Sequence, residues 1–237
     1  MKNLLVITCG KDSLHTKWNN ISLRSFDLCL LVYDNTDFAD LVSSNAKYII
    51  KSENSKWHNI YTHVPYTMYN NYEQIGILDE DMETTVENIN LIFDFGKKYN
   101  FDLYAPALTH DSYYSHSQTL QQKRCDFRIT NTVEQMCPFF SVRAYDKLRP
   151  EFVASEYAWG YGLEFSFENI LKSEQGKTIF GGYVGILDKY SIKHTRKITN
   201  RVDISEPEIN FYRRRNNVKR PGVFLDYMIK GYKFPST

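Results

Sequence analysis

The chain has 237 residues, of which 24% are charged and 15% aromatic, and its formal net charge is +1. This composition excludes a disordered or low-complexity protein, and the length suffices to bury a large core without a disulfide scaffold. At about 150 residues per domain, we expect one large domain or two small ones. The many aromatic residues favour core packing, with sugar or nucleobase binding as the alternative interpretation.

The charge is distributed unevenly along the chain. Residues 189–220 contain ten Lys or Arg against three acidic residues, a net charge of +7, and residues 221–237 add +1, so residues 1–188 carry −7. Such a basic segment can face phosphates, anionic lipid or only solvent. We interpret it as a surface for an anionic acceptor or a membrane face. An ordinary solvated tail is the alternative.

The N-terminus and the cysteines indicate the compartment. The apolar run Leu4–Ile7 is too short for a secretory signal or a membrane span. The four cysteines, at positions 9, 29, 125 and 137, form no CxxC pair, which argues against a zinc ribbon. We expect reduced, mostly buried thiols in a cytoplasmic protein, with peripheral membrane contact through the basic C-terminal region.

Four short apolar runs in the first 80 residues are each followed by polar residues. They are Asn3–Thr8, Asp27–Tyr33, Ala46–Ile50 and Gln74–Leu78. The stretches between them are long enough for helices, and this alternation predicts an α/β domain with a mainly parallel central sheet flanked by helices. Ligands bind such sheets at the carboxyl ends of the strands. Thr8, Asp34, Asp79 and Asp81 should therefore converge.

The rest of the chain continues the alternation. After Asp81 we expect a helix with Thr84 and Glu87 at capping-box spacing. The further predicted elements are strands at Phe101–Leu108, at Thr132–Val142 with an interruption by Pro138, and at Thr178–Leu187, and helices at Arg143–Leu148 and Phe165–Lys172. No repeat or linker is visible, so we expect one domain over residues 1–200 and a basic C-terminal extension over 201–237.

The first candidate site follows a predicted strand. Asp79 and Asp81 come directly after the apolar run and are two residues apart, so on a strand they face the same side. Paired carboxylates suit Mg²⁺ or Mn²⁺, which keep open positions for phosphate oxygens. The alternative is a solvated acidic turn at the N-terminus of the next helix.

The second candidate site is the segment Tyr157–Phe165, with the sequence YAWGYGLEF. Its two glycines permit a sharp turn and close approach to a ligand, and Trp159 and Tyr161 offer flat apolar faces to a sugar ring. Glu164 lies at the start of a predicted helix, where it could accept a proton from an attacking hydroxyl. The alternative is a helix-initiating turn with buried aromatic residues and a capping acid.

The third candidate site is the segment Ile192–Arg196, with the sequence IKHTR. A neutral His194 imidazole could coordinate a divalent metal, and the Arg196 guanidinium could bind a phosphate through two hydrogen bonds. The alternative is the exposed end of a strand with mixed charges, where His194 has only a structural role.

Together the three segments resemble a known family. The order is an apolar strand with DxD, then WGxGxE, then HTR after a Gly-rich strand, and it resembles the metal-dependent nucleotide-sugar glycosyltransferases of the GT-A fold. The chain is similar to glycosyltransferase-like proteins with a WGLDF-type element and a later HTR element. It is more distantly similar to the beta-1,4-galactosyltransferases, with their DxD-type motif, WGWGGED segment and HSR. The resemblance spans residues 1–196.

The resemblance implies roles for individual residues. Asp79 and Asp81 would be the DxD pair, with Asp81 the more direct ligand, and His194 a further ligand of Mn²⁺ or Mg²⁺. This metal would bridge the two phosphates of a nucleoside-diphosphate sugar. The implied substrate-binding positions are Thr8 near the nucleotide, Asp34 at the ribose or base, Lys56 at the donor, and Trp159 and Gly160 beside a sugar.

One position departs from the galactosyltransferase pattern. That pattern has an acid after WGWGGE, where this chain has Phe165. In the more similar proteins the acid follows WGL directly, which fits Glu164. We therefore expect Glu164 to be the base of an inverting transfer, with Glu156 as the reserve candidate.

The sequence therefore predicts a hexosyltransferase-type glycosyltransferase that depends on a divalent metal. The donor would be a nucleoside-diphosphate sugar, with a UDP-sugar favoured, and the acceptor a carbohydrate, a lipid-linked molecule or a protein. A non-catalytic carbohydrate- or nucleotide-binding protein of the same fold is the alternative, motivated by Phe165. A nucleic-acid binder, suggested by Arg213–Arg215, is disfavoured by the acidic body and the lack of a recognised motif, so we expect no nucleic-acid partner.

Overall fold

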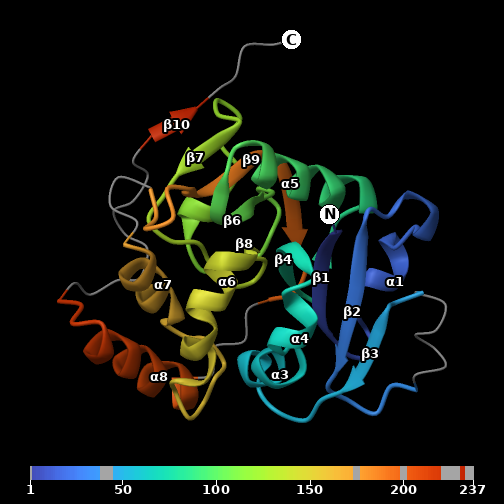
Figure 1. Ribbon diagram of the computed structural model, residues 1–237, viewed down its shortest axis with the longest axis horizontal. Helices are drawn as coiled ribbons and strands as arrows, with labels where there is room; N and C mark the ends of the chain where they lie inside the picture. Colours follow the sequence, from blue (N-terminus) through green and yellow to red (C-terminus); the bar gives the residue numbers. More distant parts are fainter. Residues whose placement is uncertain (1, 38–44, 173–176, 198–201, 220–229, 233–237) are drawn as a thin grey trace.

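The computed structural model describes residues 2–37, 45–172, 177–197, 202–219 and 230–232 (Figure 1). The strands are β1 (Lys2–Cys9), β2 (Phe26–Val32), β3 (Tyr48–Lys51), β4 (Tyr72–Asp79), β5 (Met82–Glu83), β6 (Phe101–Leu108), β7 (Phe127–Ile129), β8 (Phe139–Ser141), β9 (Tyr183–His194) and β10 (Lys230–Tyr232). The α-helices are α1 (His15–Trp18), α3 (Lys56–His63), α4 (Tyr66–Tyr69), α5 (Val86–Lys98), α6 (Val142–Leu148), α7 (Leu163–Leu171) and α8 (Val202–Arg215). Short 3₁₀ helices are η1 (Ile21–Leu23), η2 (Ser117–Thr119) and η3 (Arg149–Val153).

The described strands build a mixed central sheet. Its order is β10-β7-β9-β6-β8-β4-β1-β2-β3, with β5 paired to β9 outside this path. Strands β3, β2, β1 and β4 are parallel, β8 runs antiparallel to both β4 and β6, and β9 is parallel to β6. The carboxyl ends of β1, β2, β4, β6 and β9 therefore share one edge, as expected from the alternation of strands and helices.

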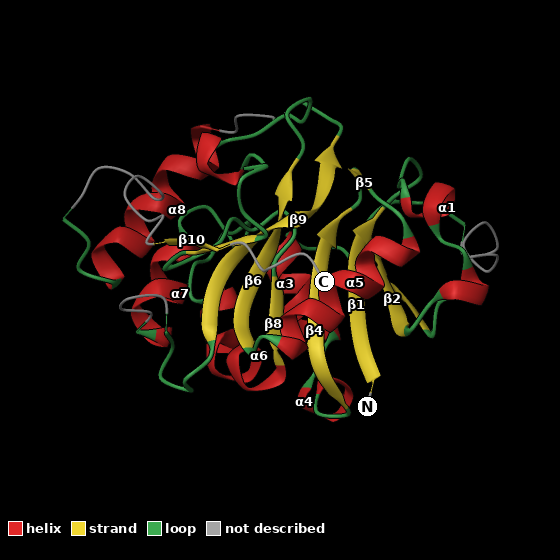
Figure 2. Cartoon of the chain, turned by 90° about the horizontal axis from the view of Figure 1, so that it is seen from above, coloured by secondary structure: helices red, strands yellow, loops and turns green. Residues whose placement is uncertain are grey.

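Helices cover both faces of the sheet. Phe139 and Phe140 are neighbours on β8, so their side chains point to opposite faces. Phe139 packs on Phe93 of α5 with ring centroids 5.0 Å apart, whereas Phe140 packs on Tyr145 of α6 at 5.8 Å. Helix α5 thus crosses one face (Figure 2), and α6 lies on the other.

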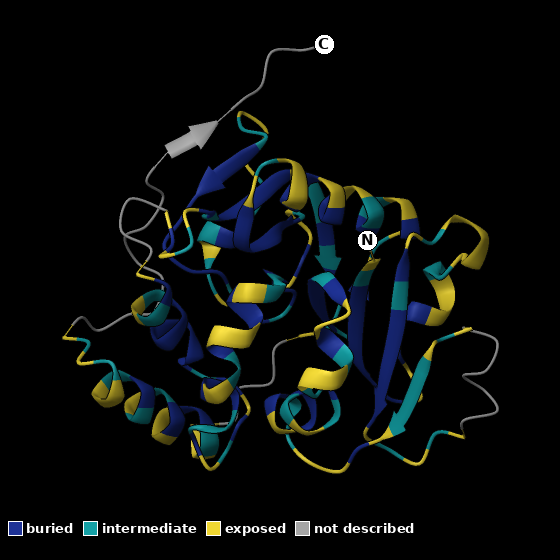
Figure 3. Ribbon diagram, viewed as in Figure 1, coloured by how far each residue is buried: buried dark blue, intermediate teal, exposed yellow. Residues whose placement is uncertain are grey.

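Burial on both faces explains the continuous apolar runs. Leu4–Ile7 of β1 and Leu28–Val32 of β2 are at most 1% exposed, and Figure 3 shows both strands as buried along most of their length. Parallel strands that are covered on both sides require apolar residues at successive positions rather than alternate ones.

Some predicted elements were displaced. The cap of α5 is Thr85, whose hydroxyl accepts from the Asn88 amide at 3.1 Å, so the expected capping box at Thr84 was wrong by one residue. Of the predicted strand Thr132–Val142, only Phe139–Ser141 is a strand. The residues before it form a loop that runs beside β4 and makes isolated hydrogen bonds to it, such as that from the Asp79 amide to the Met136 carbonyl at 3.0 Å. Strand β9 starts later than predicted, after a turn in which Gly181 has φ +77°.

Other expectations concern the cysteines, the membrane and the domain boundary. All four cysteines are free thiols, and Cys9, Cys29 and Cys137 are buried. Among the described helices, none combines the length and apolarity needed to cross a bilayer. The expected boundary at residues 200 and 201 lies outside the described residues.

A buried ion pair fixes the β7 side of the sheet. Arg128 on β7 and Asp188 on β9 are each about 1% exposed, and the guanidinium donates to both carboxylate oxygens at 2.8 and 2.9 Å. Arg128 also donates to the carbonyls of Gln118 and Leu120, so the loop before β7 is held by the same side chain.

We predict that Asp188→Asn lowers the free energy of unfolding by about 3–5 kcal/mol, because it leaves the buried Arg128 charge uncompensated. Urea unfolding at neutral pH measures this loss. As the control, Asp111→Asn breaks an ion pair with Lys193 on the surface and should leave the unfolding midpoint unchanged. Equal midpoints for the two variants would contradict the prediction.

Candidate functional site

Backbone pairing brings the second aspartate to the histidine. Strand β5 follows the Asp79–Asp81 turn and pairs antiparallel with the end of β9, with Met82 opposite His194. The Asp81 carbonyl accepts from the Thr195 amide at 3.1 Å, and the Asp81 Oδ2 atom lies 3.1 Å from His194 Nε2. The two side chains, 113 positions apart in the sequence, therefore meet through main-chain geometry.

The His194 ring has a fixed orientation. Its Nδ1 atom lies 2.8 Å from the Tyr113 carbonyl oxygen, which accepts only, so Nδ1 carries the proton. Nε2 then points at the Asp81 carboxylate. Burial lowers the pKa of His194, but the hydrogen bond and charge of Asp81 outweigh burial and raise it overall.

The first aspartate has a different partner. Lys56, at the start of α3, places its Nζ atom 2.6 Å from Asp79 Oδ1 and 2.5 Å from the Gln135 carbonyl oxygen. Both carboxylates were expected to bind metal, yet here Asp79 faces a lysine and Asp81 a histidine. Within the described residues, no three or more His, Cys, Asp or Glu side chains are gathered as a metal-binding group.

The middle acid of the motif connects three segments. Glu80 forms an ion pair with Arg196 and accepts from the Gly10 amide at 2.7 Å. Arg196 also donates to the Asp12 carbonyl at 2.6 Å. The guanidinium expected to bind phosphate thus holds the loop after β1 against the end of β9 in the structure described here.

The expected nucleotide positions lie on β1 and β2. Thr8 is 9% exposed and pairs with Asp79 in the sheet register. Asp34 follows β2 and accepts from the Lys11 amide at 2.8 Å. Burial raises the pKa of Asp34, but hydrogen bonds from Thr36 and Lys11 outweigh it, and the pKa is lowered overall.

The aromatic turn contains a glycine whose backbone conformation and close neighbours disfavour any side chain. Gly160 has φ +103°, and a Cβ there would lie 2.1 Å from Gln135 Oε1 and 2.3 Å from Trp57 Nε1. Trp159 beside it is 42% exposed, which leaves part of its ring open to solvent. The expected sugar-facing position of Trp159 is therefore accessible, whereas Gly160 contributes only backbone.

Glu164 lies in the first turn of α7 and is only 7% exposed. Its Oε2 atom has no hydrogen-bond partner among the described residues. Burial raises the pKa of this carboxyl to about 8. The reserve candidate Glu156, in contrast, is exposed and lies before the turn.

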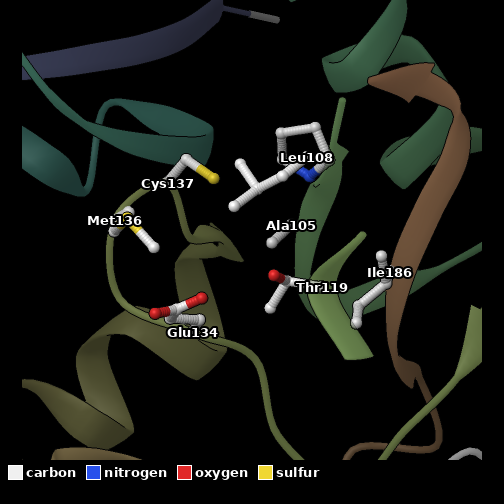
Figure 4. Close-up of a pocket in the computed structure, with 8 residues that line it drawn as sticks. Ala105, Leu108, Thr119, Glu134, Met136, Cys137 and Ile186 are labelled. Atoms are coloured by element: carbon white, nitrogen blue, oxygen red, sulfur yellow. The ribbon is translucent and has the colours of Figure 1, made fainter. Parts of the chain in front are cut away.

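Sequence reasoning missed a second carboxyl with a buried oxygen atom, that of the half-buried Glu134. It lines a water-sized cavity of about 10 Å³ together with Thr119 and Cys137 (Figure 4), and its Oε2 atom has no partner among the described residues. Burial raises its pKa to about 7, and the charges of His194 and Asp79 act on it in opposite directions. An acid within the apolar stretch 133–140 was the available signal in the sequence.

The two halves of the candidate site are connected. Gln135 accepts from Lys56 through its carbonyl, and its side-chain amide donates to the Gly160 carbonyl at 2.5 Å. The Trp57 amide donates to the Ala158 carbonyl at 3.0 Å. Helix α3 and the loop at Gln135 therefore link the aspartates to the turn that precedes Glu164.

Solved structures of S. aureus TarS share this fold. TarS 1–349 in complex with UDP-GlcNAc has a TM-score of 0.59 and 10% identity, covering 92% of this chain and 66% of that chain. TarS 1–349 gives 0.56 and 11%, covering 82% and 60%, and a further TarS structure gives 0.55 and 10%, covering 83% and 37%. This chain thus spans less than two thirds of each. The likeness confirms the predicted α/β fold of the GT-A glycosyltransferase type.

Comparison of the sequence itself gives no relative. No protein-family model and no curated protein matches the chain. The resemblance to the beta-1,4-galactosyltransferases stays an expectation from the sequence.

We predict that Glu164→Gln changes how stability depends on pH. Burial raises the pKa of Glu164 from 4.5 to about 8, so the folded state holds this proton more tightly than the unfolded state does. The resulting stabilisation is complete below pH 4.5 and is lost as the pH rises to about 8. From pH 5 to 8 the wild type should lose stability relative to Glu164→Gln by up to about 1.4 kcal/mol per pH unit.

Urea unfolding of both proteins at four pH values measures this difference. Glu156→Gln, at an exposed position, should follow the wild type throughout. Parallel curves for the wild type and Glu164→Gln would show that Glu164 titrates alike in the folded and unfolded states.

Proposed function

We propose that this protein is a glycosyltransferase that uses a nucleoside-diphosphate sugar, with UDP as the favoured nucleotide. One observation carries the proposal: Asp81 and His194 meet at the carboxyl edge of the sheet, beside Lys56, in a fold shared with TarS, which was crystallised with UDP-GlcNAc. Ligands of open α/β sheets bind at this edge. The acceptor would be a hydroxyl of a carbohydrate, a lipid-linked molecule or a protein.

The Asp81–His194 pair fits a divalent cation. The Tyr113 carbonyl fixes the proton of a neutral His194 on Nδ1, so the Nε2 lone pair points toward the Asp81 carboxylate. A cation bound by Nε2 and the carboxylate would satisfy both acceptors. The buried Asp81 Oδ1 atom, with no partner among the described residues, is a further oxygen available to it. Mn²⁺ or Mg²⁺ held by these residues would neutralise charge on the donor diphosphate.

Lys56 supplies a second positive charge at the same edge. Its Nζ atom is 2.6 Å from Asp79, and its side chain is only 12% exposed. An ammonium held in place by Asp79 and the Gln135 carbonyl needs little reorganisation to stabilise a leaving diphosphate. Asp79 would then act on the donor through Lys56 as well as through the metal.

Glu164 is the proposed base. An acceptor hydroxyl would transfer its proton to the Glu164 carboxylate while its oxygen bonds to the anomeric carbon and the nucleoside diphosphate leaves, which inverts that carbon. A pKa of about 8 is close to neutral pH, where a carboxylate is a stronger base than at its ordinary pKa of 4.5. The buried environment that raises the pKa also keeps bulk water away from the proton.

A non-catalytic sugar- or nucleotide-binding protein is the second candidate. Phe165 favours it, because this residue occupies the place of an acid in the galactosyltransferase pattern and is 1% exposed. The two candidates share the donor site and differ in whether Glu164 transfers a proton.

We predict that UDP-GlcNAc with Mn²⁺ stabilises the protein by about 2.7 kcal/mol at a concentration of about 100 times its Kd. EDTA should abolish the stabilisation, as should Asp81→Asn or His194→Ala, because each substitution removes one of the proposed metal ligands. Thermal unfolding measures it. His110→Ala, at an exposed position near the same edge, should behave as the wild type. An equal shift in EDTA would contradict metal-dependent binding.

We also predict that Glu164→Gln retains the donor-induced thermal shift but lowers the rate of UDP release at least 10²-fold, since the amide cannot accept the proton. UDP release from UDP-GlcNAc, with water or added saccharides as acceptor, is the measurement. Glu156→Gln is the matched control. Full activity in Glu164→Gln would disprove the assignment of the base, and donor binding without UDP release by the wild type would favour the binding protein.

A further inference from the structure

Helix α8, from the basic C-terminal quarter, carries a carboxylate that is aimed at the aromatic turn. Glu208 is 0% exposed, and its two oxygens accept from the amides of Gly160 and Tyr161 at 3.2 Å each. Burial raises the pKa of Glu208, and hydrogen bonds from these amides, Ser155 and Trp159 counteract it. A buried carboxylate therefore gathers the backbone N–H groups of the turn around itself.

The helix backbone also contacts the turn directly. Gly162 has φ +84°, and a Cβ on it would lie 3.0 Å from the Ile209 Cα atom and 3.5 Å from Tyr212 Cβ. The Tyr212 hydroxyl donates to the Glu151 carbonyl at 2.7 Å, and Arg215 donates to both oxygens of Glu151 at 2.8 Å. Helix α8 is thus attached to η3 and to the turn by three successive helical turns.

The other contacts of the turn come from the loop at Gln135, which also contacts Lys56. The Gly160 carbonyl accepts from the Gln135 side chain, and the Leu163 amide, which opens α7, donates to the same carbonyl at 3.0 Å. The turn is therefore fixed between Gln135 on one side and Glu208 on the other. Glu164 follows one residue after Leu163, so the position of its carboxyl depends on both anchors.

We propose that Glu208 is a positioning residue of the site: it holds the turn 159–161 so that Glu164 and Trp159 face the donor. The inference rests on the proposed function for its effect on catalysis, but the anchoring of the turn can be measured without any activity. It also gives α8 a role that the basic composition of the segment 189–220 does not indicate.

The test uses the full chain and the variants Glu208→Gln and Glu206→Gln. Glutamine keeps one acceptor oxygen but presents N–H groups to the second amide, so one charge-assisted hydrogen bond is replaced by a repulsive contact. Glu206 lies on the same helix and is exposed, which makes its variant the matched control. Hydrogen exchange at single-residue resolution, UDP release and the UDP-GlcNAc thermal shift with Mn²⁺ are compared.

We expect the Gly160 and Tyr161 amides to exchange at least tenfold faster in Glu208→Gln, with helix α8 still protected. For UDP release, kcat should fall about tenfold while the donor KM and the thermal shift stay within twofold of wild type. Unchanged exchange at both amides, or a loss of donor binding equal to the loss of kcat, would overturn the proposal.

Two further outcomes keep the test decisive. In the wild type both amides should exchange as slowly as the middle of α8, and fast exchange there would overturn the proposal even if Glu208→Gln did not fold. If the wild type neither binds UDP-GlcNAc nor releases UDP, the proposed function fails, while the exchange data still decide whether Glu208 anchors the turn.

Discussion

The candidate site depends on the short pairing between β5 and the end of β9. Two residues of β5 lie against His194 and Lys193, and this pairing, together with the hydrogen bond from the Thr195 amide to the Asp81 carbonyl, brings the Asp79–Asp81 turn to a histidine from a distant part of the chain. Backbone hydrogen bonds therefore bring the Asp81 and His194 residues together, and their side chains only complete the contact. Because β9 is also parallel to β6 within the sheet, the histidine is fixed relative to the whole core. A preorganised pair of this kind binds an ion with little loss of side-chain entropy.

Acidic side chains are concentrated at this edge of the sheet, and ion pairs with basic side chains compensate three of them. Three successive acids, residues 79–81, are matched one by one with Lys56, Arg196 and His194. Among the described residues Glu134 and Glu164 form no ion pair, and burial raises both of their pKa values, to about 7 and about 8. The ion-paired acids are suited to binding and the other two to proton transfer, because burial brings the pKa values of Glu134 and Glu164 close to neutral pH.

Much of the sheet could be predicted because its signals are local. The apolar runs of β1, β2 and β4 and the polar residues after them can be recognised from consecutive positions in the sequence. They predicted where the strands end and that Asp79 lies at the carboxyl edge of the sheet. Long-range pairings could not be predicted: that Lys56 faces Asp79, or that Glu80 forms an ion pair with Arg196, depends on how distant segments fold together. The segment 132–138 was assigned to a strand because its composition is apolar, whereas it is a buried loop that carries Glu134.

The basic C-terminal quarter shows why composition alone misleads about function. Of the three consecutive arginines at 213–215, Arg215 forms an ion pair with Glu151 at the surface, and α8 reaches the candidate site through an acid, Glu208. A net charge does not show these contacts: Arg215 connects α8 to η3, whereas Glu208 accepts hydrogen bonds from backbone amides. The physical role of α8 follows from its buried face, which is apolar and acidic around Glu208 and Tyr212, rather than from its exposed one. A helix from a basic segment of the chain can therefore contribute to a site through a single buried carboxylate.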